Sequence, residues 1–317
     1  MTDAAEVMTD TFGRRITDVR LALNSVCNLH CCYCHSEGES INGCTRSKKQ
    51  DGLSKEEIIE VVSVLQSLGV KTLKITGGEP TLRKDLADII SSIPKGVNVS
   101  LTTNGTKLKE LAPKLKAAGL TRVNVSLDSL KRERYAQITG SDILPDVLEG
   151  IEAAVSAGLT PVKINTVLLP GINDDEIDDF LAFVRGRDEL ILQFIELMDM
   201  NGWADKADAS VHSNADFARN LEERFKREAE TITTRRMHHR HKYNLNGAVV
   251  EIVRPMHNAE FCANCNRLRI TSDGLLKPCL LRTGNEVSIK GLKGDALIEA
   301  IRHAVQNRSP YFGGKND

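Results

Sequence analysis

The sequence predicts an α/β protein in which parallel strands alternate with helices, followed by a C-terminal module with a different pattern. Three observations support this. Short β-branched runs alternate with amphipathic stretches between residues 17 and 196, polar residues follow several of the runs, and the alternation stops after Met200. Repeated parallel units form either a barrel or an open doubly wound sheet, and in both the ligand site lies at the carboxyl ends of the strands.

Six apolar runs have the length and composition of strands. They are residues 18–23, 72–76, 97–102, 122–127, 162–168 and 190–196. The stretches between them have the apolar period of helices. Ser54 is the expected N-cap of the first helix, with Glu57 at the capping-box position and Gly69 just after the last turn.

Polar or turn-forming segments directly follow four of these runs. They are residues 24–27 (NSVC), 77–80 (GGEP), 103–105 (TNG) and 128–129 (DS). Because the carboxyl ends of parallel strands meet at one edge of the sheet, we expect the chemistry of the protein to gather there.

The last third of the chain has its own elements. A helical stretch at residues 214–230 precedes two strand-like runs joined by Asn246-Gly247, which is typical of a type I′ hairpin, and a further helix fits residues 294–306. We therefore divide the chain into an N-terminal extension (residues 1–16), a barrel-sized domain (17–200) and a C-terminal domain (201–317).

The charge balance excludes two classes of partner. Lys and Arg number 42 against 43 Asp and Glu, so no overall field favours nucleic acid or anionic membranes. The N-terminus lacks an apolar signal segment, and no run of 18 apolar residues occurs. We expect a soluble, cytoplasmic protein, and we interpret the basic tract at residues 235–242 as a hairpin strand.

Eight cysteines in a reducing compartment point to metal binding rather than to disulfides. Cys27, Cys31 and Cys34 have the spacing C-x3-C-x2-C, which gives three thiolates to an iron-sulfur cluster that normally takes four. One iron would stay open for a ligand, as in catalytic zinc sites. The alternative is a zinc ion whose fourth ligand is His30 or His35.

A second group, Cys262, Cys265 and Cys279, again offers three thiolates, with the spacing C-x2-C-x13-C. The alternative here is a zinc ribbon completed by His257. Cys32 and Cys44 receive no role.

The motifs resemble those of a known family. The first cysteine group, with Tyr33 before its third cysteine, and GGEP at 77–80 resemble the radical SAM (S-adenosylmethionine) superfamily. Residues 261–269 (FCANCNRLR) and the continuation to Cys279 resemble the MoaA family, the GTP 3′,8-cyclases of molybdenum cofactor biosynthesis. Residues 12–14 (FGR), 102–105 (TTNG) and 124–128 (NVSLD) match the same family.

This resemblance implies a fold and a reaction. The fold would be an incomplete (βα)6 TIM-like radical SAM barrel with a C-terminal iron-sulfur cluster domain that also binds GTP. The enzyme would be a lyase that cleaves SAM, removes a hydrogen atom from C3′ of GTP and joins that carbon to C8, giving 3′,8-cyclo-7,8-dihydro-GTP. A second cluster would bind the guanine edge.

The resemblance also implies the site residues. Two 4Fe-4S clusters would be held by Cys27, Cys31 and Cys34 and by Cys262, Cys265 and Cys279. SAM contacts would be Tyr33, Gly78, Ser126 and Met198. GTP contacts would be Arg20, Lys74, Thr102, Lys163, Arg267 and Arg269. Lys74 and Lys163 lie inside apolar strand runs, where a charge is costly unless it faces a polar cavity.

Further implications concern partners. The resemblance implies a homodimer, a reductant such as ferredoxin or flavodoxin, and transfer of the product to cyclic pyranopterin monophosphate synthase. Three features depart from the family pattern. Lys74 stands where bacterial relatives usually carry Arg, Gln193 stands where many members carry another Arg, and three residues follow Gly313-Gly314, the usual end of the chain. The rival interpretations are a peptide-modifying radical SAM enzyme and a non-catalytic metal-binding or electron-carrying module.

Overall fold

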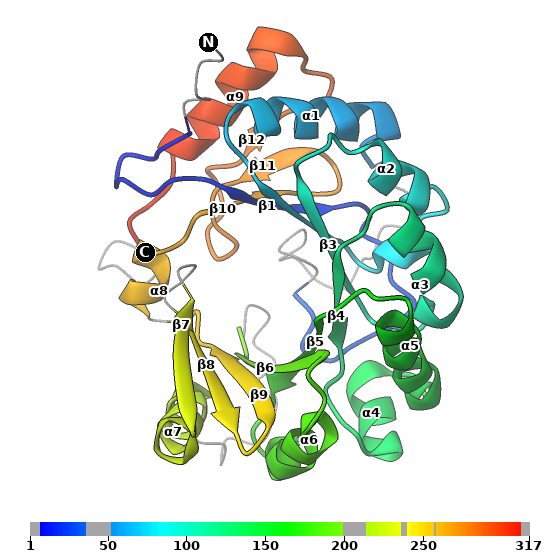
Figure 1. The fold of residues 1–317 in the computed structure, drawn as a ribbon. Coiled ribbons are helices and arrows are strands. Elements are labelled where there is room, and N and C mark those ends of the chain that lie inside the picture. Colours follow the sequence, from blue (N-terminus) through cyan, green and yellow to red (C-terminus); the bar gives the residue numbers. More distant parts are fainter. Residues whose placement is uncertain (1–6, 36–51, 199–213, 236–239, 257, 312–317) are drawn as a thin grey trace.

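The computed structural model describes residues 7–35, 52–198, 214–235, 240–256 and 258–311. These residues form a single twelve-stranded sheet, curved around a central space, with helices on its outer side (Figure 1). The strand order is β12-β11-β10-β1-β2-β3-β4-β5-β6-β9-β8-β7.

The six predicted strands are confirmed to within one residue at each end. They are β1 (Asp18–Ala22), β2 (Thr72–Thr76), β3 (Asn98–Thr103), β4 (Arg122–Ser126), β5 (Val162–Leu168) and β6 (Leu190–Glu196). Each pairs in parallel with the next. The order runs from β1 to β6 without the reversal of a doubly wound sheet, and the described sheet does not close on itself. The fold is therefore an incomplete barrel.

Helices cover the outer face of these strands (Figure 1). They are α1 (Lys55–Ser67), α2 (Leu86–Ser92), α3 (Leu108–Ala117), α4 (Arg132–Thr139), α5 (Leu144–Ser156) and α6 (Ile177–Val184), with short 3-10 turns η2 (Pro80–Leu82) and η3 (Asp174–Glu176). The outward-facing strand residues, such as Leu73 and Val123, are fully buried beneath them in one apolar core. The predicted capping box is confirmed: Glu57 N donates to Ser54 Oγ and Ser54 N donates to Glu57 Oε2.

The last third of the chain extends both edges of the sheet. On one side α7 (Asn214–Glu228), β7 (Thr231–Arg235), β8 (Arg240–Leu245) and β9 (Ala248–Val253) follow β6; on the other β10 (Arg267–Ile270), β11 (Leu275–Lys277) and β12 (Val287–Ser288) follow β1. The elements α8 (Ala259–Ala263) and α9 (Gly294–Gln306) complete it. In Figure 1, β10 lies beside β1 although the two are far apart in sequence.

The predicted hairpin joins β8 to β9. Asn246 and Gly247 both have positive φ, 50° and 79°, as a type I′ turn requires. The residues of β8 confirm a strand at the end of the basic tract, whereas residues 236–239 lie outside the described part of the chain. The predicted domain boundary at residue 200, Cys44 and the Gly313-Gly314 tail also lie outside it. No helix of the described segments is long and apolar enough to cross a bilayer.

We expect Ser54→Ala to lower the free energy of unfolding by about 1 kcal/mol, because the first turn of α1 loses its side-chain acceptor. Ser67→Ala is the matched control: this exposed serine donates to the nearby carbonyl of Val64 at the other end of the helix, and its loss should change stability by less than about 0.5 kcal/mol. Urea unfolding of the two variants measures the difference. Equal effects would contradict the capping role.

Candidate active site

Strand register places alternate residues of neighbouring strands on the inner face of the sheet. In β1, Asp18 lies opposite Arg267 and Thr72, and Arg20 lies opposite Arg269 and Lys74. The alternate residues, such as Val19, face the helices and are fully buried. The inner face is therefore polar and charged, whereas the outer face is apolar.

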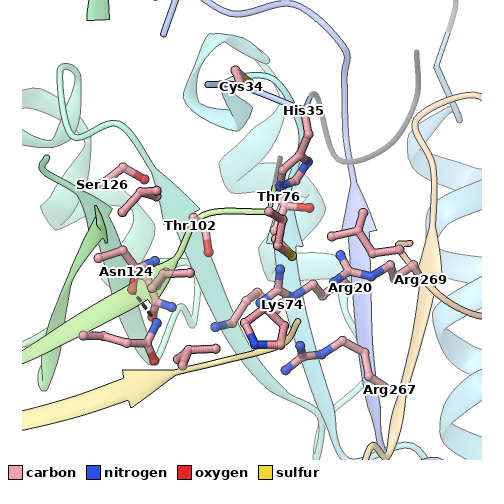
Figure 2. Close-up of a pocket in the computed structure, with 18 of the residues that line it drawn as sticks. Arg20, Cys34, His35, Lys74, Thr76, Thr102, Asn124, Ser126, Arg267 and Arg269 are labelled. Carbon is pink, nitrogen blue, oxygen red and sulfur yellow. Dashed lines mark hydrogen bonds between the residues drawn. The ribbon is translucent and has the colours of Figure 1, made fainter. Parts of the chain in front are cut away.

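This inner face encloses a cavity of about 390 Å³. Every residue that the sequence predicted for a site lines it: Cys27, Cys31, Cys34, Cys262, Cys265, Cys279, Tyr33, Gly78, Ser126, Met198, Arg20, Lys74, Thr102, Lys163, Arg267 and Arg269. In Figure 2, Arg20, Lys74 and Arg267 extend into the same region, and Cys34 lies on the other side of His35 and Thr76. The individual roles of these residues stay predictions, but all of them line the same cavity.

The first cysteine group lies in the loop after β1. The backbone of this loop is fixed to the end of α4, because His30 N donates to Thr139 O and Cys32 N donates to Ile138 O. Cys27 Sγ accepts from Leu29 N at 3.4 Å and from Asn104 Nδ2 at 4.0 Å. Cys32 is exposed and does not line the cavity.

The thiols of this loop suit an iron-sulfur cluster. Burial, then the charge of Asp128, then the neighbouring thiolates of Cys34 and Cys27 raise the pKa of Cys31 far above its usual value. Iron binding would relieve this repulsion, since cationic metal stabilises thiolates. Among the described residues, no three Cys, His, Asp or Glu side chains converge on one ion position. A cubane cluster does not require such convergence, because each cysteine binds a different iron.

The loop after β2 closes against the cysteine loop. Gly78 N donates to Asn24 O and Glu79 N donates to Val26 O, both at 2.7 Å. The Glu79 carboxylate is buried and accepts hydrogen bonds from Thr81, Thr103 and the backbone of Asn104. That side chain therefore ties the β2 loop to the β3 loop, and residues 77–79 line the cavity beside it.

Tyr33 is fixed by a buried carboxylate from the end of β4. Its hydroxyl donates to Asp128 Oδ2 at 2.6 Å, and Asp128 Oδ1 accepts from Val167 N at 2.8 Å. Burial raises the pKa of Asp128 to about 6, against the lowering effect of these two hydrogen bonds. The pair orients the ring between the cysteine loop and the strand that carries Ser126.

One carboxylate, Asp18, pairs with a cation beside β1. Arg267 Nε donates to Asp18 Oδ1 at 2.7 Å, and Thr72 Oγ1 donates to Asp18 Oδ2. Burial would raise the pKa of Asp18, but the charge and hydrogen bond of Arg267 outweigh it and hold that pKa well below the usual range. Burial, and then the charges of Arg20 and Arg267, lower the pKa of Lys74 well below its usual value. An anion bound here would reverse that effect.

A second polar network lies across the cavity, on β5, β6, β8 and β9. Lys163 Nζ donates to the fully buried Glu251 at 2.6 Å. The guanidinium of Arg240 lies 3.6 Å from the same carboxylate and donates to Gln193 Oε1 at 2.9 Å. Gln193 in turn donates to Asn165 Oδ1.

Sequence reasoning did not assign Asp18, Glu251, Arg240 or Asn165 to the site. Asp18 and Asn165 stand at alternate positions from Arg20 and Lys163 on the same strands, so strand alternation could have found them. Nothing local marks Arg240 or Glu251, because β8 and β9 reach the cavity only by pairing beside β6.

Two family models match the chain. Residues 22–184 match the radical SAM superfamily, and residues 190–313 match the domain described as Molybdenum Cofactor Synthesis C.

The chain is also similar to curated proteins over nearly its whole length. It is 49% identical to a probable GTP 3′,8-cyclase of Methanocella arvoryzae over 308 residues, which cover 96% of this chain and 95% of that protein. It is 45% identical to a probable GTP 3′,8-cyclase of Archaeoglobus fulgidus, with 97% of this chain and 100% of that protein covered.

Solved structures share the fold at low identity. Streptococcus suis SuiB bound to precursor peptide SuiA superposes with a TM-score of 0.67 at 16% identity, covering 95% of this chain and 67% of that one. Native anSMEcpe with bound AdoMet gives a TM-score of 0.61 at 18% identity, covering 90% and 81%. At these identities the similarity shows the fold alone and does not favour a peptide substrate.

We expect Gly78→Ala to weaken SAM binding about tenfold or more, because the added Cβ would overlap the backbone carbonyl of Val26, and overpacking a rigid site costs about 1–3 kcal/mol. Gly186→Ala is the control. Gly186 has φ +71° and open space around an added Cβ, so its substitution strains the backbone away from the cavity. Anaerobic equilibrium dialysis with labelled SAM compares the two; unchanged binding by Gly78→Ala would contradict the close approach of the two loops.

Proposed function

The chain belongs to the radical SAM superfamily and, within it, to the GTP 3′,8-cyclase family, and on that premise we propose that it converts GTP to 3′,8-cyclo-7,8-dihydro-GTP in molybdenum cofactor biosynthesis. One observation from the structure supports this proposal. Two groups of three cysteines and a set of strand-borne cations line the same cavity, so a bound nucleotide would have access to both groups.

SAM and one iron-sulfur cluster are the cofactors that superfamily membership implies, which makes zinc at the first cysteine group the weaker interpretation. When bound, this cluster supplies the electron that cleaves SAM reductively. The chain itself holds the cysteine loop against α4, orients Tyr33 through Asp128 and lets the β2 loop pack closely against the cysteine loop at Gly78.

We infer that Cys262, Cys265 and Cys279 hold a second 4Fe-4S cluster. The support is that these thiols line the cavity together with Arg267 and Arg269, and that the match to the molybdenum cofactor domain spans all three. A fourth ligand from His257, which would favour zinc, lies outside the described residues. Iron analysis separates the two: two clusters give about eight iron atoms per chain, and one cluster with zinc gives about four.

The triphosphate needs cations, and the strands supply them. Arg20, Lys74, Arg267 and Arg269 extend from β1, β2 and β10, and Lys163 extends from β5. Ion pairs to Asp18 and Glu251 neutralise part of this charge and hold the side chains in place. A triphosphate would neutralise the remainder, and arginine forks bind phosphate oxygens in pairs. Thr102 adds a hydroxyl on the same face.

We propose Arg240 as a further triphosphate contact. It lines the cavity from β8, and its hydrogen bond to Gln193 brings a guanidinium to the position where many family members carry an arginine of their own. Gln193 on β6 is uncharged, and Arg240 supplies a cation to it from β8, two places away in the sheet.

The remaining partners are proposals that rest on family membership. We propose that the protein is a homodimer, that ferredoxin or flavodoxin reduces it, and that cyclic pyranopterin monophosphate synthase takes its product. A cytoplasmic location also stays a prediction.

The decisive assay incubates the anaerobic, iron-reconstituted protein with SAM, dithionite and GTP and follows 5′-deoxyadenosine and nucleotides by mass spectrometry. The proposal expects 5′-deoxyadenosine together with an isomer of GTP of unchanged mass. SAM cleavage that ignores GTP would favour a peptide substrate. No cleavage by iron-loaded protein would favour the non-catalytic metal module.

Two cysteine variants should fail in different ways. Cys34→Ala removes a ligand of the SAM-side cluster and should abolish 5′-deoxyadenosine formation. Cys279→Ala leaves that loop intact and should retain some SAM cleavage while losing the cyclised nucleotide. The same assay measures both, with Cys32→Ala, an exposed cysteine outside the cavity, as the control. Wild-type levels of 5′-deoxyadenosine from Cys34→Ala would defeat the first assignment.

For Arg240→Gln we expect the KM for GTP to rise about tenfold or more with little change in SAM affinity, because a charge-assisted hydrogen bond contributes about 1.5–3 kcal/mol. Arg254→Gln is the control, since Arg254 pairs with Glu222 and does not line the cavity. Steady-state kinetics with varied GTP provide the measurement. An equal rise in KM for both variants would place Arg240 among general structural contacts.

A further inference from the structure

Three charged residues from the two ends of the chain are buried together. Asp10 Oδ2 accepts from Arg14 Nε at 2.7 Å and from Arg308 at 2.8 Å. The side chains are 0%, 8% and 3% exposed in that order. We call Asp10, Arg14 and Arg308 the terminal brace. Charges at this depth are costly unless every one is paired or hydrogen-bonded, so their grouping is specific.

Each arginine of the terminal brace also holds the backbone of a cysteine of the second group. Arg14 donates to the carbonyl of Cys262 at 3.1 Å, and Arg308 donates to the carbonyl of Cys265 at 2.9 Å. Cys265 N donates to the same Cys262 carbonyl, which closes the turn between them. Both cysteines of the C-x2-C turn are therefore held through their main chains by two arginines that pair with one buried carboxylate.

A tight local turn holds Asp10 and Arg14 of the terminal brace. Asp10 Oδ1 accepts from the backbones of Phe12 and Arg14, and Gly13, at φ +77°, completes the turn between them. Arg14 also donates to the carbonyls of Ser309 and Pro310. The turn at residues 10–14 thus sets the place of the cysteine turn and of the segment that follows α9.

The terminal brace carries two positive charges against one negative. The guanidinium of Arg308 donates to the main chain of Cys265 at 2.9 Å, so its positive charge lies beside a proposed ligand of the second cluster. Positive charge beside an iron-sulfur cluster favours its reduced form and raises its reduction potential.

We propose that the terminal brace is a positioning device for the second cluster: it fixes the Cys262–Cys265 turn and sets the reduction potential of the metal bound there. This inference rests on the proposed second cluster. It gives the turn at residues 10–14 and Arg308 a role in holding that cluster. In the contacts described above, neither of them bonds to the cations proposed to bind the nucleotide.

The test uses the full-length chain with Cys27, Cys31 and Cys34 all replaced by alanine, so that only the second site can bind a cluster. The first measurement is the iron content after anaerobic reconstitution. If this background binds no iron-sulfur cluster, the proposed second cluster fails, whatever the terminal brace does. If it binds about four iron atoms per chain, the brace can be tested on its own.

In that background, Arg308→Gln should lower the reduction potential and change the electron paramagnetic resonance spectrum of the cluster. Arg308→Lys, which keeps the charge but loses the fork, should lie closer to the parent in potential. Arg83→Gln is the matched control, because Arg83 also pairs with an aspartate, Asp85, and holds two backbone carbonyls, but it does so away from the second cysteine group.

Potentiometric titration and thermal unfolding together decide the outcome. The proposal expects both arginine-to-glutamine variants to lose stability and Arg308→Gln alone to shift the potential and spectrum. A full cluster with unchanged potential and spectrum in Arg308→Gln would overturn the proposal and leave a purely structural tie between the chain ends. Should Arg308→Gln not fold, Asp10→Asn carries the comparison, because it removes the negative charge of the terminal brace. An unchanged potential and spectrum in Asp10→Asn would overturn the proposal equally.

Discussion

The alternation of side chains along parallel strands in register is the constraint on which this molecule depends. Every second residue of β1 to β6 must face the helices, and every other one must face the interior of the incomplete barrel. The outward residues are apolar and form one core. The inward residues can then be charged, since one another, a ligand or water can supply their hydrogen bonds and counter-charges. The stability of the barrel and its chemistry are thus carried by opposite faces of the same strands.

The last third of the chain completes the interior from two sides. β10 brings Arg267 and Arg269 to the open edge of β1, and β9 brings Glu251 to the edge of β6. Each addition supplies a partner of opposite charge: Arg267 pairs with Asp18, and Glu251 pairs with Lys163. The ion pairs across these strand junctions therefore also fix where the added strands lie.

The sequence predicted the features that local rules control. Strand runs, the capping box at Ser54, the Asn246-Gly247 turn and the cysteine spacings are all encoded within a few residues. The pairing of Lys163 with Glu251 could not be predicted, because strand register selects a partner 88 residues away. The same holds for Asp10 and Arg308, which are 298 residues apart, and for Arg240, whose strand was predicted but whose orientation depends on β9. Local patterns indicate the secondary structure of each segment, whereas long-range strand pairing decides which partner each charged side chain contacts.

The position of β10 beside β1 has a consequence for synthesis on the ribosome. The first strand to emerge keeps one edge unpaired until residues 267–270 have left the exit tunnel, and an unpaired edge invites association with other chains. The cysteine turn and Arg308 emerge later than nearly all of the barrel. The nascent chain therefore cannot assemble its interior in the order of translation.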